Sequence, residues 1–375
     1  MTRVVVTSTC AVSAIGKTSQ ELWRGLCLGK RGVRAVPELV GLDITAGGLV
    51  DRAYADRATG IARHAIDTAL GESGRSAATT AFIWGTGLDL CERTPAGLVQ
   101  RSAGETFSAL AHPFATPRRM IAVACATGTA AIGEAFQLIR AGRVEACVAG
   151  GSSTMLGAFY AFGFHALRAV AVEVPGEDPA TACKPFDRRR RGFALADGAG
   201  ALVLEALDSA RRRGAQPLAE IVGYGASQDA FDLNRPPGDG AGALLAMQRA
   251  RADAGGGAID AVNAHGTGTL AGDLAEAAAI RALVGDAWSR TPVSSCKGAI
   301  GHAMAAAGAL EAIVAIETCR TGVVPPTMNL EEPDEACALD HVIGAPRETD
   351  ATRVLSVSFG MGGQNAAILI SRFES

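Results

Sequence analysis

The segment Ala122-Val-Ala-Cys-Ala-Thr-Gly-Thr-Ala-Ala-Ile-Gly133 decides how this chain is expected to fold. The apolar stretch 120–124 suits a buried strand, and small residues then form a turn that begins at Cys125. Beyond the turn, apolar residues recur at helical spacing, which predicts a helix with one buried face. These residues are Ile132, Ala135, Phe136 and Ile139. Cys125 is therefore expected at the start of a helix that follows a buried strand.

A cysteine in this position is a candidate nucleophile. Unpaired N–H groups and the positive end of the helix dipole favour a thiolate there. Two histidine motifs follow far downstream, Asn263-Ala-His-Gly-Thr-Gly-Thr269 and Lys297-Gly-Ala-Ile-Gly-His302. One cysteine with remote histidine partners is typical of nucleophilic acyl transfer. The alternative is a buried structural thiol, which is our interpretation of the other eight cysteines, because no CxxC pair or histidine cluster indicates a metal site.

Composition narrows the class of protein. The chain has 375 residues, is 48% hydrophobic and carries a net charge of −3, which allows a large core and gives no sign of a nucleic-acid partner. We find no apolar run long enough to cross a membrane and no signal peptide. Nine cysteines without a disulfide-like framework fit a reducing compartment, so we expect a cytoplasmic protein.

The two halves of the chain resemble each other. Ala81-Phe-Ile-Trp-Gly-Thr-Gly87 and Ala261-Val-Asn-Ala-His-Gly-Thr-Gly268 are both apolar strands that end in Gly-Thr-Gly, and the strand in 4–13 resembles that in 221–227. Strands alternate with helical stretches, which predicts an α/β layered fold. The helical stretches are 60–70, 129–140, 242–254, 273–283 and 304–317. We expect two similar halves, residues 1–213 with the nucleophile and 214–375 with the histidines and lysine, and an active site at their junction.

A series of motifs, taken together, resembles the β-ketoacyl-acyl-carrier-protein synthases, the elongating condensing enzymes of the thiolase-like superfamily. The motifs are Ala124-Cys-Ala-Thr-Gly128, Val148-Ala-Gly-Gly151, Lys184-Pro-Phe-Asp187, Gly192-Phe-Ala-Leu-Ala-Asp-Gly-Ala-Gly200, the two histidine motifs, Pro325-Pro-Thr-Met-Asn329 and Ser358-Phe-Gly-Met-Gly-Gly-Gln-Asn365. Any one of them is weak, but all of them in this order are highly specific. The resemblance implies a thiolase-like duplicated αβαβα layered fold with mixed sheets.

The resemblance also implies a reaction, the decarboxylative Claisen condensation of an acyl-enzyme with malonyl-acyl carrier protein, in fatty-acid or type II polyketide or polyene synthesis. An acyl chain would first move onto Cys125, and the carbanion from a malonyl thioester would then attack it. Neutral His265 and His302 would donate hydrogen bonds to the thioester oxygen as charge develops. Lys297 and Glu276 would form a buried ion pair that orients the histidines.

Further roles follow from the resemblance. The substrates would arrive on the 4′-phosphopantetheine arm of a carrier protein, with no bound cofactor and no metal. The backbone N–H groups of Cys125 and Met361 would form an oxyanion hole, and Thr267 and Thr269 would hydrogen-bond the arm. The remaining substrate-binding candidates are Phe359, Met361, Asn234, Phe164 and Arg168. Met361 stands where related synthases usually carry a phenylalanine gate, and a flexible thioether predicts a looser gate.

The expected partners are an acyl carrier protein and a second subunit. Arg168 matches a family position near the carrier entrance, and the basic run Arg188-Arg-Arg-Arg191 is a second candidate for docking an acidic carrier. The run Arg211-Arg-Arg213 is interpreted as solvated surface. A homodimer is expected through the strand at about 119–124, and a heterodimer with a second ketosynthase-like chain is the alternative.

Other functions remain possible at this point. Compared with the family, the segment 88–119 is shortened, so the shape of the acyl pocket cannot be transferred. The shortening favours a chain-length-factor-like partner subunit of a heterodimeric ketosynthase, whereas the intact Cys125 opposes it. A thiolase would need a second cysteine in the loop 360–365, which has none. An initiating synthase would carry asparagine in place of one of the two histidines.

Overall fold

One large mixed sheet organises the chain. The computed structural model describes residues 2–39, 43–44, 46–50, 54, 56–88, 90–94 and 97–374. Eleven strands hydrogen-bond in the order β15 (Asp340–His341), β13 (Pro292–Ser294), β12 (Ala261–Asn263), β17 (Arg353–Phe359), β18 (Gln364–Ser371), β11 (Ala219–Gln228), β1 (Val4–Val12), β10 (Gly198–Ala206), β8 (Ala146–Ser153), β4 (Ala81–Thr86) and β7 (Ala115–Ile121). Smaller sheets are formed by β2 (Val33–Ala35), β3 (Ala46–Gly48) and β9 (Leu195–Ala196), by β5 (Leu90–Thr94) and β6 (Gly97–Arg101), and by β14 (Val323–Val324) and β16 (Arg347–Glu348).

The sheet reveals the duplication that the sequence predicted. Outward from the centre, β1, β10, β8, β4 and β7 form one half, and β11, β18, β17, β12 and β13 form the other in the same arrangement. The halves meet where Val4–Val6 pairs antiparallel with Ala219–Ile221. The two segments with similar sequences, β4 and β12, occupy equivalent places. The expected boundary at 213/214 falls between α6 (Leu207–Arg212) and β11.

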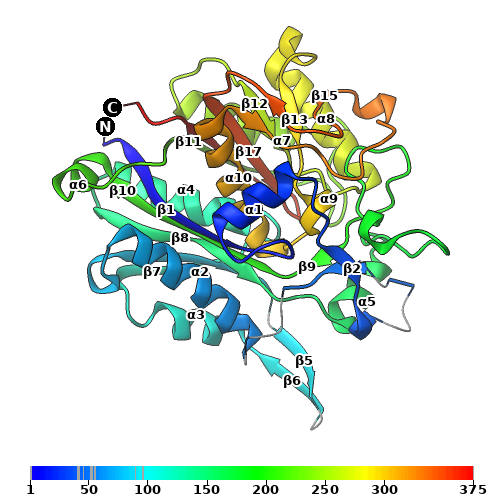
Figure 1. Cartoon of the computed structure of the whole chain (residues 1–375), viewed down its shortest axis with the longest axis horizontal. Coiled ribbons are helices and arrows are strands. Elements are labelled where there is room, and N and C mark those ends of the chain that lie inside the picture. The colour runs from blue at the N-terminus through cyan, green and yellow to red at the C-terminus, as the bar shows by residue number, and fades with distance from the viewer. Residues whose placement is uncertain are drawn as a thin grey trace.

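Helices cover the sheet in layers, as Figure 1 shows. The helices α4 (Thr127–Arg140) and α10 (Ala307–Thr321) contact each other and lie between the two halves of the sheet. On the outer faces, α2 (Arg57–Ser73) covers the first half, and α7 (Ala241–Asp253) with α8 (Leu270–Val284) covers the second. The remaining helices are α1 (Ser19–Cys27), α3 (Ala103–Ala111), α5 (Ala158–Ala166) and α9 (Lys297–Ile300). This layered α/β arrangement confirms the predicted fold class.

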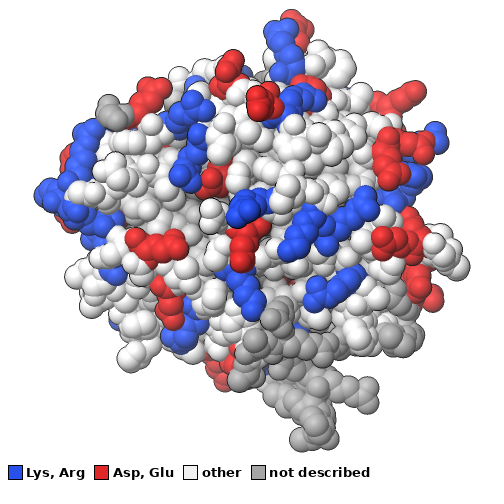
Figure 2. All heavy atoms as spheres, viewed as in Figure 1, with Lys and Arg blue, Asp and Glu red and all other residues white. Residues whose placement is uncertain are grey.

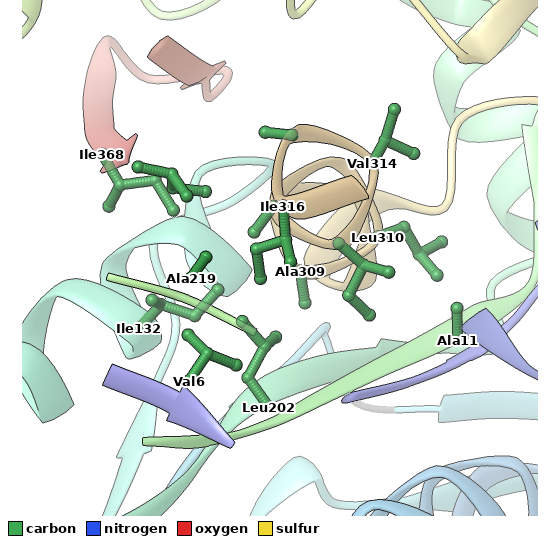
Figure 3. Packing of buried hydrophobic residues seen from close by; sticks show 14 of the residues in the cluster. Val6, Ala11, Ile132, Leu202, Ala219, Ala309, Leu310, Val314, Ile316 and Ile368 are labelled. Atoms are coloured by element: carbon green, nitrogen blue, oxygen red, sulfur yellow. The ribbon is translucent and has the colours of Figure 1, made fainter. Parts of the chain in front are cut away.

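Small residues allow the two central helices to approach closely. A Cβ atom on Gly128 of α4 would lie 2.7 Å from the backbone nitrogen of Ala309 of α10, so only glycine fits there. The predicted apolar face of α4 is fully buried, and Figure 3 shows Ile132 in the same core as Leu202 and Leu310. Burying a side chain of this size contributes about 1.5–3 kcal/mol. The central packing therefore fixes the start of α4, where Cys125 lies.

The prediction of a buried strand at 120–124 is wrong. The structure gives β7 as Ala115–Ile121, and this strand lies at the edge of the large sheet with its side chains mostly exposed. Arg118, Arg119 and Met120 on this edge strand are exposed. The apolar run therefore does not form an interior strand of the isolated chain.

Charged groups are spread over the surface. On the face seen in Figure 2, basic and acidic side chains are both present and distributed over much of the surface. No helix among the described residues is long and apolar enough to cross a membrane.

Candidate active site

Cys125 lies in a strained turn between β7 and α4. Ala124, directly before it, has a φ of +50°, a backbone angle that residues other than glycine rarely adopt. The turn is closed by the backbone N–H of Val123, which donates to Thr127 Oγ1 at 2.8 Å, and by the N–H of Thr127, which donates to the carbonyl of Ala124 at 3.2 Å. Strain of this kind is retained where a side chain must be held in one direction.

The Cys125 thiol is protonated in the resting protein. Burial raises its pKa to about 11, although the positive charge of Lys297 and the backbone N–H groups of Met361 and Cys125 act to lower it. The sequence-based expectation of a thiolate is therefore wrong for the unliganded site. The loss of hydration at a buried sulfur outweighs the favourable field at the helix start. A nearby group must accept the proton when the sulfur attacks.

Two buried imidazoles stand next to each other. His265 follows β12 and His302 follows α9, and their ring centroids lie 5.3 Å apart at an interplanar angle of 85°. Burial lowers the pKa of both rings well below 6.5, and the charge of Lys297 lowers it further. Both rings are therefore neutral near pH 7, and each can donate one hydrogen bond and accept another.

Lys297 fixes the tautomer of His265. Its ammonium Nζ donates to the backbone carbonyl of His265 at 2.5 Å and lies 3.3 Å from Nδ1 of the same residue. An ammonium has no acceptor, so Nδ1 accepts and the ring proton resides on Nε2. His265 thus keeps one N–H available for a substrate oxygen.

The predicted ion pair between Lys297 and Glu276 is wrong. Lys297 pairs instead with Glu311 of α10, and both side chains are fully buried. Burial opposes the charge on Lys297, but the Glu311 carboxylate raises its pKa, so the ammonium stays charged. Glu311 is the single polar residue in the otherwise apolar stretch 304–316, a signal that the sequence contained and that we missed.

Glu276 instead binds the backbone of the loop that carries His265. Its carboxyl oxygens accept hydrogen bonds from the backbone N–H groups of His265 and Gly266, each at 2.7 Å. Asp273, one turn earlier on α8, accepts from the N–H groups of Thr267 and Gly268 at 3.1 Å. Burial raises the pKa of Glu276 to about 8 and that of Asp273 to about 6. These two acids hold the loop that carries His265 and do not pair with the lysine.

The loop between β17 and β18 brings a backbone donor to the sulfur. It is closed by the N–H of Gly360, which donates to the carbonyl of Gln364 at 2.7 Å, and is tied to a second loop by the N–H of Gly362, which donates to the carbonyl of Leu233 at 2.9 Å. Gly362 has a φ of +95°, so glycine is required at this position. The arrangement directs the N–H groups of Met361 and Cys125 at the Cys125 sulfur.

A cavity of about 440 Å³ connects these groups. Most of the residues predicted for the site line it: Cys125, His265, His302, Glu276, Thr267, Thr269, Phe359, Met361, Asn234 and Arg168. Lys297 does not line the cavity, because it lies behind His265. Phe164 does not line it either, and packs edge-on against Phe193 with centroids 5.5 Å apart. Among the described residues, no group of three His, Cys, Asp or Glu side chains could hold a metal ion.

The basic run 188–191 is engaged within the chain. Arg188 pairs with Glu332, Arg189 with Asp187 and Glu331, Arg190 with Asp334, and Arg191 with Glu177. These carboxylates neutralise the run, which weakens it as a docking site for an acidic partner. Arg168 differs, because it is exposed at the cavity and no ion pair with a described residue is found for it.

Comparison with known proteins places these features in a family. The models for the N-terminal and C-terminal domains of β-ketoacyl synthases match residues 108–210 and 218–331. The chain is 34% identical to 3-oxoacyl-[acyl-carrier-protein] synthase 2 of Rhizobium meliloti over 422 aligned positions, which cover 100% of this chain and 99% of the relative. It is 41% identical to the Staphylococcus aureus protein of the same name over 261 positions, 69% of this chain and 62% of that one.

Solved structures give the same result. A chain of the AntDE:AntF complex, a type II PKS acyl-carrier protein in complex with its ketosynthase, superposes with a TM-score of 0.90 at 25% identity, and the match covers 99% of this chain and 100% of that chain. The ishigamide ketosynthase/chain length factor has a TM-score of 0.88 at 28% identity, with complete coverage of both chains. A β-ketoacyl synthase from Burkholderia phymatum has a TM-score of 0.88 at 30% identity, again with complete coverage.

Proposed function

This chain belongs to the β-ketoacyl synthase family and is a condensing acyltransferase, and we propose that it extends acyl chains held on an acyl carrier protein by decarboxylative condensation with a malonyl thioester. The observation that carries this proposal is the convergence of two backbone N–H groups on a buried sulfur that shares its cavity with two neutral imidazoles. This constellation can stabilise negative charge on a thioester oxygen at two separate stages.

The first stage is transfer of the acyl chain. The Cys125 sulfur attacks the carrier thioester, and the oxygen that gains negative charge is held by the N–H groups of Met361 and Cys125. The carrier sulfur leaves and takes up the proton that the Cys125 thiol loses, so this stage neither gains nor releases a proton. Because the thiol pKa is about 11, the proton stays on sulfur until a substrate is bound. This order protects the nucleophile from wasteful reaction.

The second stage is decarboxylation and condensation. The malonyl thioester oxygen accepts hydrogen bonds from the two imidazoles, carbon dioxide leaves, and the electron pair of the broken bond forms an enolate. The enolate carbon attacks the acyl group on Cys125, the sulfur departs as a thiolate that takes up a proton from solvent, and a β-ketoacyl thioester is released. The Nε2–H of His265, fixed by Lys297, is one of the two donors. Substrates arrive on a carrier, so the reaction needs no resident cofactor.

The proposed carrier partner is an acyl carrier protein, delivered to the mouth of the cavity. Arg168 supplies an exposed positive charge there, and Thr267 and Thr269 line the wall that a pantetheine arm would follow. The similarity to relatives named for acyl-carrier-protein substrates supports this partner. The similarity to a ketosynthase/chain length factor keeps one alternative, a chain-length-factor-like subunit of a heterodimer.

The test of this function is intact mass spectrometry after incubation with acyl carrier proteins that bear chains of varied length. We expect one acyl adduct on the native chain and none on Cys125→Ala. Cys125→Gln is expected to retain decarboxylation of malonyl carrier, because the imidazoles are unchanged. A native chain that forms no adduct from any carrier would favour the chain-length subunit, and an adduct on Cys125→Ala would show that Cys125 is not the nucleophile.

A further inference from the structure

Three buried hydroxyl groups without partners meet in one small cavity. Thr86, Thr106 and Ser153 are each only 5% exposed, and none of their oxygens has a hydrogen-bond partner among the described residues. All three line a cavity of about 20 Å³. Burying an unpaired hydroxyl costs free energy, and most buried polar groups are therefore paired. Three such groups around one space point to a ligand atom that satisfies them.

The cavity lies close to the nucleophile. Thr86 ends β4 and Ser153 ends β8, and these parallel strands bring their carboxyl ends to the same edge of the sheet. The turn that carries Cys125 follows β7, whose Ile121 pairs with Gly85 of β4. The side chain of Thr127, two residues after Cys125, presses on Gly85 so closely that a Cβ atom there would lie 2.4 Å from Thr127 Cγ2. Neighbouring strand residues face opposite sides of the sheet, so Gly85 faces Thr127 whereas Thr86 faces the side of α2 and α3, whose Ala58 and Thr106 also line the cavity. The cavity therefore lies at the same edge of the sheet as the active-site turn.

Met155 connects the lining of the cavity to the apolar cluster around Cys125. It lines the cavity of the three hydroxyls, and it also belongs to the apolar cluster that contains Cys125 and Met304 and against which Met361 packs. Its sulfur lies 3.2 Å from where a Cβ atom on Gly87 would be. A methionine has three rotatable bonds, so it can move aside at low cost for a chain that extends from Cys125.

We propose that this cavity is a polar end to the acyl-binding space, and that it binds the ketone or hydroxyl oxygen of an acyl chain that carries one. The inference rests on the proposed function, because the chain must first be attached to Cys125. Without a chain, the volume suits a single water molecule, which the oxygen of the chain replaces. A plain hydrocarbon chain that reached the cavity would leave the hydroxyls unpaired, so the site discriminates against it.

The experiment is a competition for Cys125 between acyl carriers of equal chain length. One chain is a saturated hydrocarbon, and the others carry a single ketone at successive positions; adducts are quantified by intact mass. For the native protein we expect one ketone position to be preferred over the hydrocarbon by roughly tenfold, the effect of one or two hydrogen bonds. Ser153→Ala and Thr86→Val should each reduce that preference severalfold and leave acylation by the hydrocarbon chain unchanged.

A matched control and a stability measurement complete the test. Ser356→Ala removes another buried hydroxyl that has no partner but does not line the cavity. This variant should keep the native preference for the ketone chain over the hydrocarbon chain. Thermal unfolding checks that each variant is folded. Equal acylation by ketone and hydrocarbon chains in the native protein, or a preference that survives in Ser153→Ala/Thr86→Val, would overturn the proposal and leave a water pocket. Absence of acylation by every chain would instead refute the proposed function, and this inference with it.

Discussion

At the scale of single residues, one buried positive charge controls the chemistry of the site. Lys297 contacts His265 directly and lowers the pKa of both imidazoles, while it also acts to lower the pKa of the Cys125 thiol. Burial is the larger influence on all three groups. The three reacting groups therefore rest uncharged, as a thiol and two neutral rings beside the charged Lys297, and charge develops on them only when a substrate arrives.

The neutral imidazoles predict an unusual dependence on pH. Decarboxylation of malonyl carrier by Cys125→Gln should not decline with a midpoint at the ordinary histidine pKa of 6.5, because both rings titrate well below it.

The free energy of unfolding should depend on pH in a different way. An unfolded histidine takes up a proton as the pH falls through 6.5 and these native rings do not, so the two rings reduce stability progressively below that pH. Decarboxylation rates and chemical denaturation, measured across this range, check both statements; a rate midpoint at 6.5 in folded protein would contradict the first.

The two half-reactions should depend differently on His302. We expect His302→Ala to slow decarboxylation by about 10²–10³, the typical loss for one oxyanion donor, and to slow acylation of Cys125 much less. The reason is that acylation relies on the backbone donors at the sulfur, which this substitution leaves in place. Single-turnover acylation and carbon dioxide release should be measured separately. An equal loss in both would refute this division of roles.

The corrected ion pair makes a prediction about stability. Glu311→Gln should destabilise the protein by about 3–5 kcal/mol, because it leaves the Lys297 ammonium buried without its partner. Glu276→Gln removes one acceptor from two backbone donors and should cost less, about 1–3 kcal/mol. Chemical denaturation compares the two variants. Lys297→Met combined with Glu311→Leu should recover much of the loss, and equal losses for Glu311→Gln and Glu276→Gln would contradict the assignment of the pair.

At the scale of elements, the loop between β17 and β18 controls access to the sulfur. Met361 packs against the apolar cluster that contains Cys125, and the loop is anchored at Gly360 and Gly362. A flexible thioether in this place predicts tolerance of long or stiff acyl chains, such as conjugated ones, over short saturated ones. Met361→Phe should narrow that range, whereas Met361→Leu, which keeps an aliphatic side chain of similar size, should not. Competition between short saturated and long conjugated acyl carriers measures the change, and a preference for the short chain that Met361→Phe leaves unaltered would show that this residue is not the gate.

At the scale of the whole molecule, the exposed edge of the large sheet predicts a dimer. The strand β7 ends the sheet with unpaired backbone groups, and Met120 on it is 42% exposed. Such an edge is a template for pairing with another chain, and twofold dimers are the commonest assembly. Light scattering at micromolar concentration should give twice the chain mass, and Met120→Lys should lower it while Met120→Leu does not. A monomer that forms a complex only with a second ketosynthase-like chain would refute the homodimer and support the heterodimer.

The amino-acid sequence by itself determined the local features of this protein. Helical spacing predicted α4 and its buried face, and the repeated strand with Gly-Thr-Gly predicted the equivalent places of β4 and β12. The motifs around Cys125, His265 and His302 identified the family before the fold was known. These features could be predicted because periodicity and turn chemistry act between residues that are close in the chain.

Only the tertiary structure decided which groups meet and how burial affects them. Glu311 lies on the central helix α10, so its pairing with Lys297 depends on the packing of that helix, which sequence spacing does not reveal. The pKa of Cys125 is set first by the loss of water around it, which no helix-dipole argument includes. The three unpaired hydroxyls come from β4, β8 and α3, and they share a cavity only because the sheet brings those elements together. Pairing and desolvation depend on distances in space, and the folded chain sets those distances.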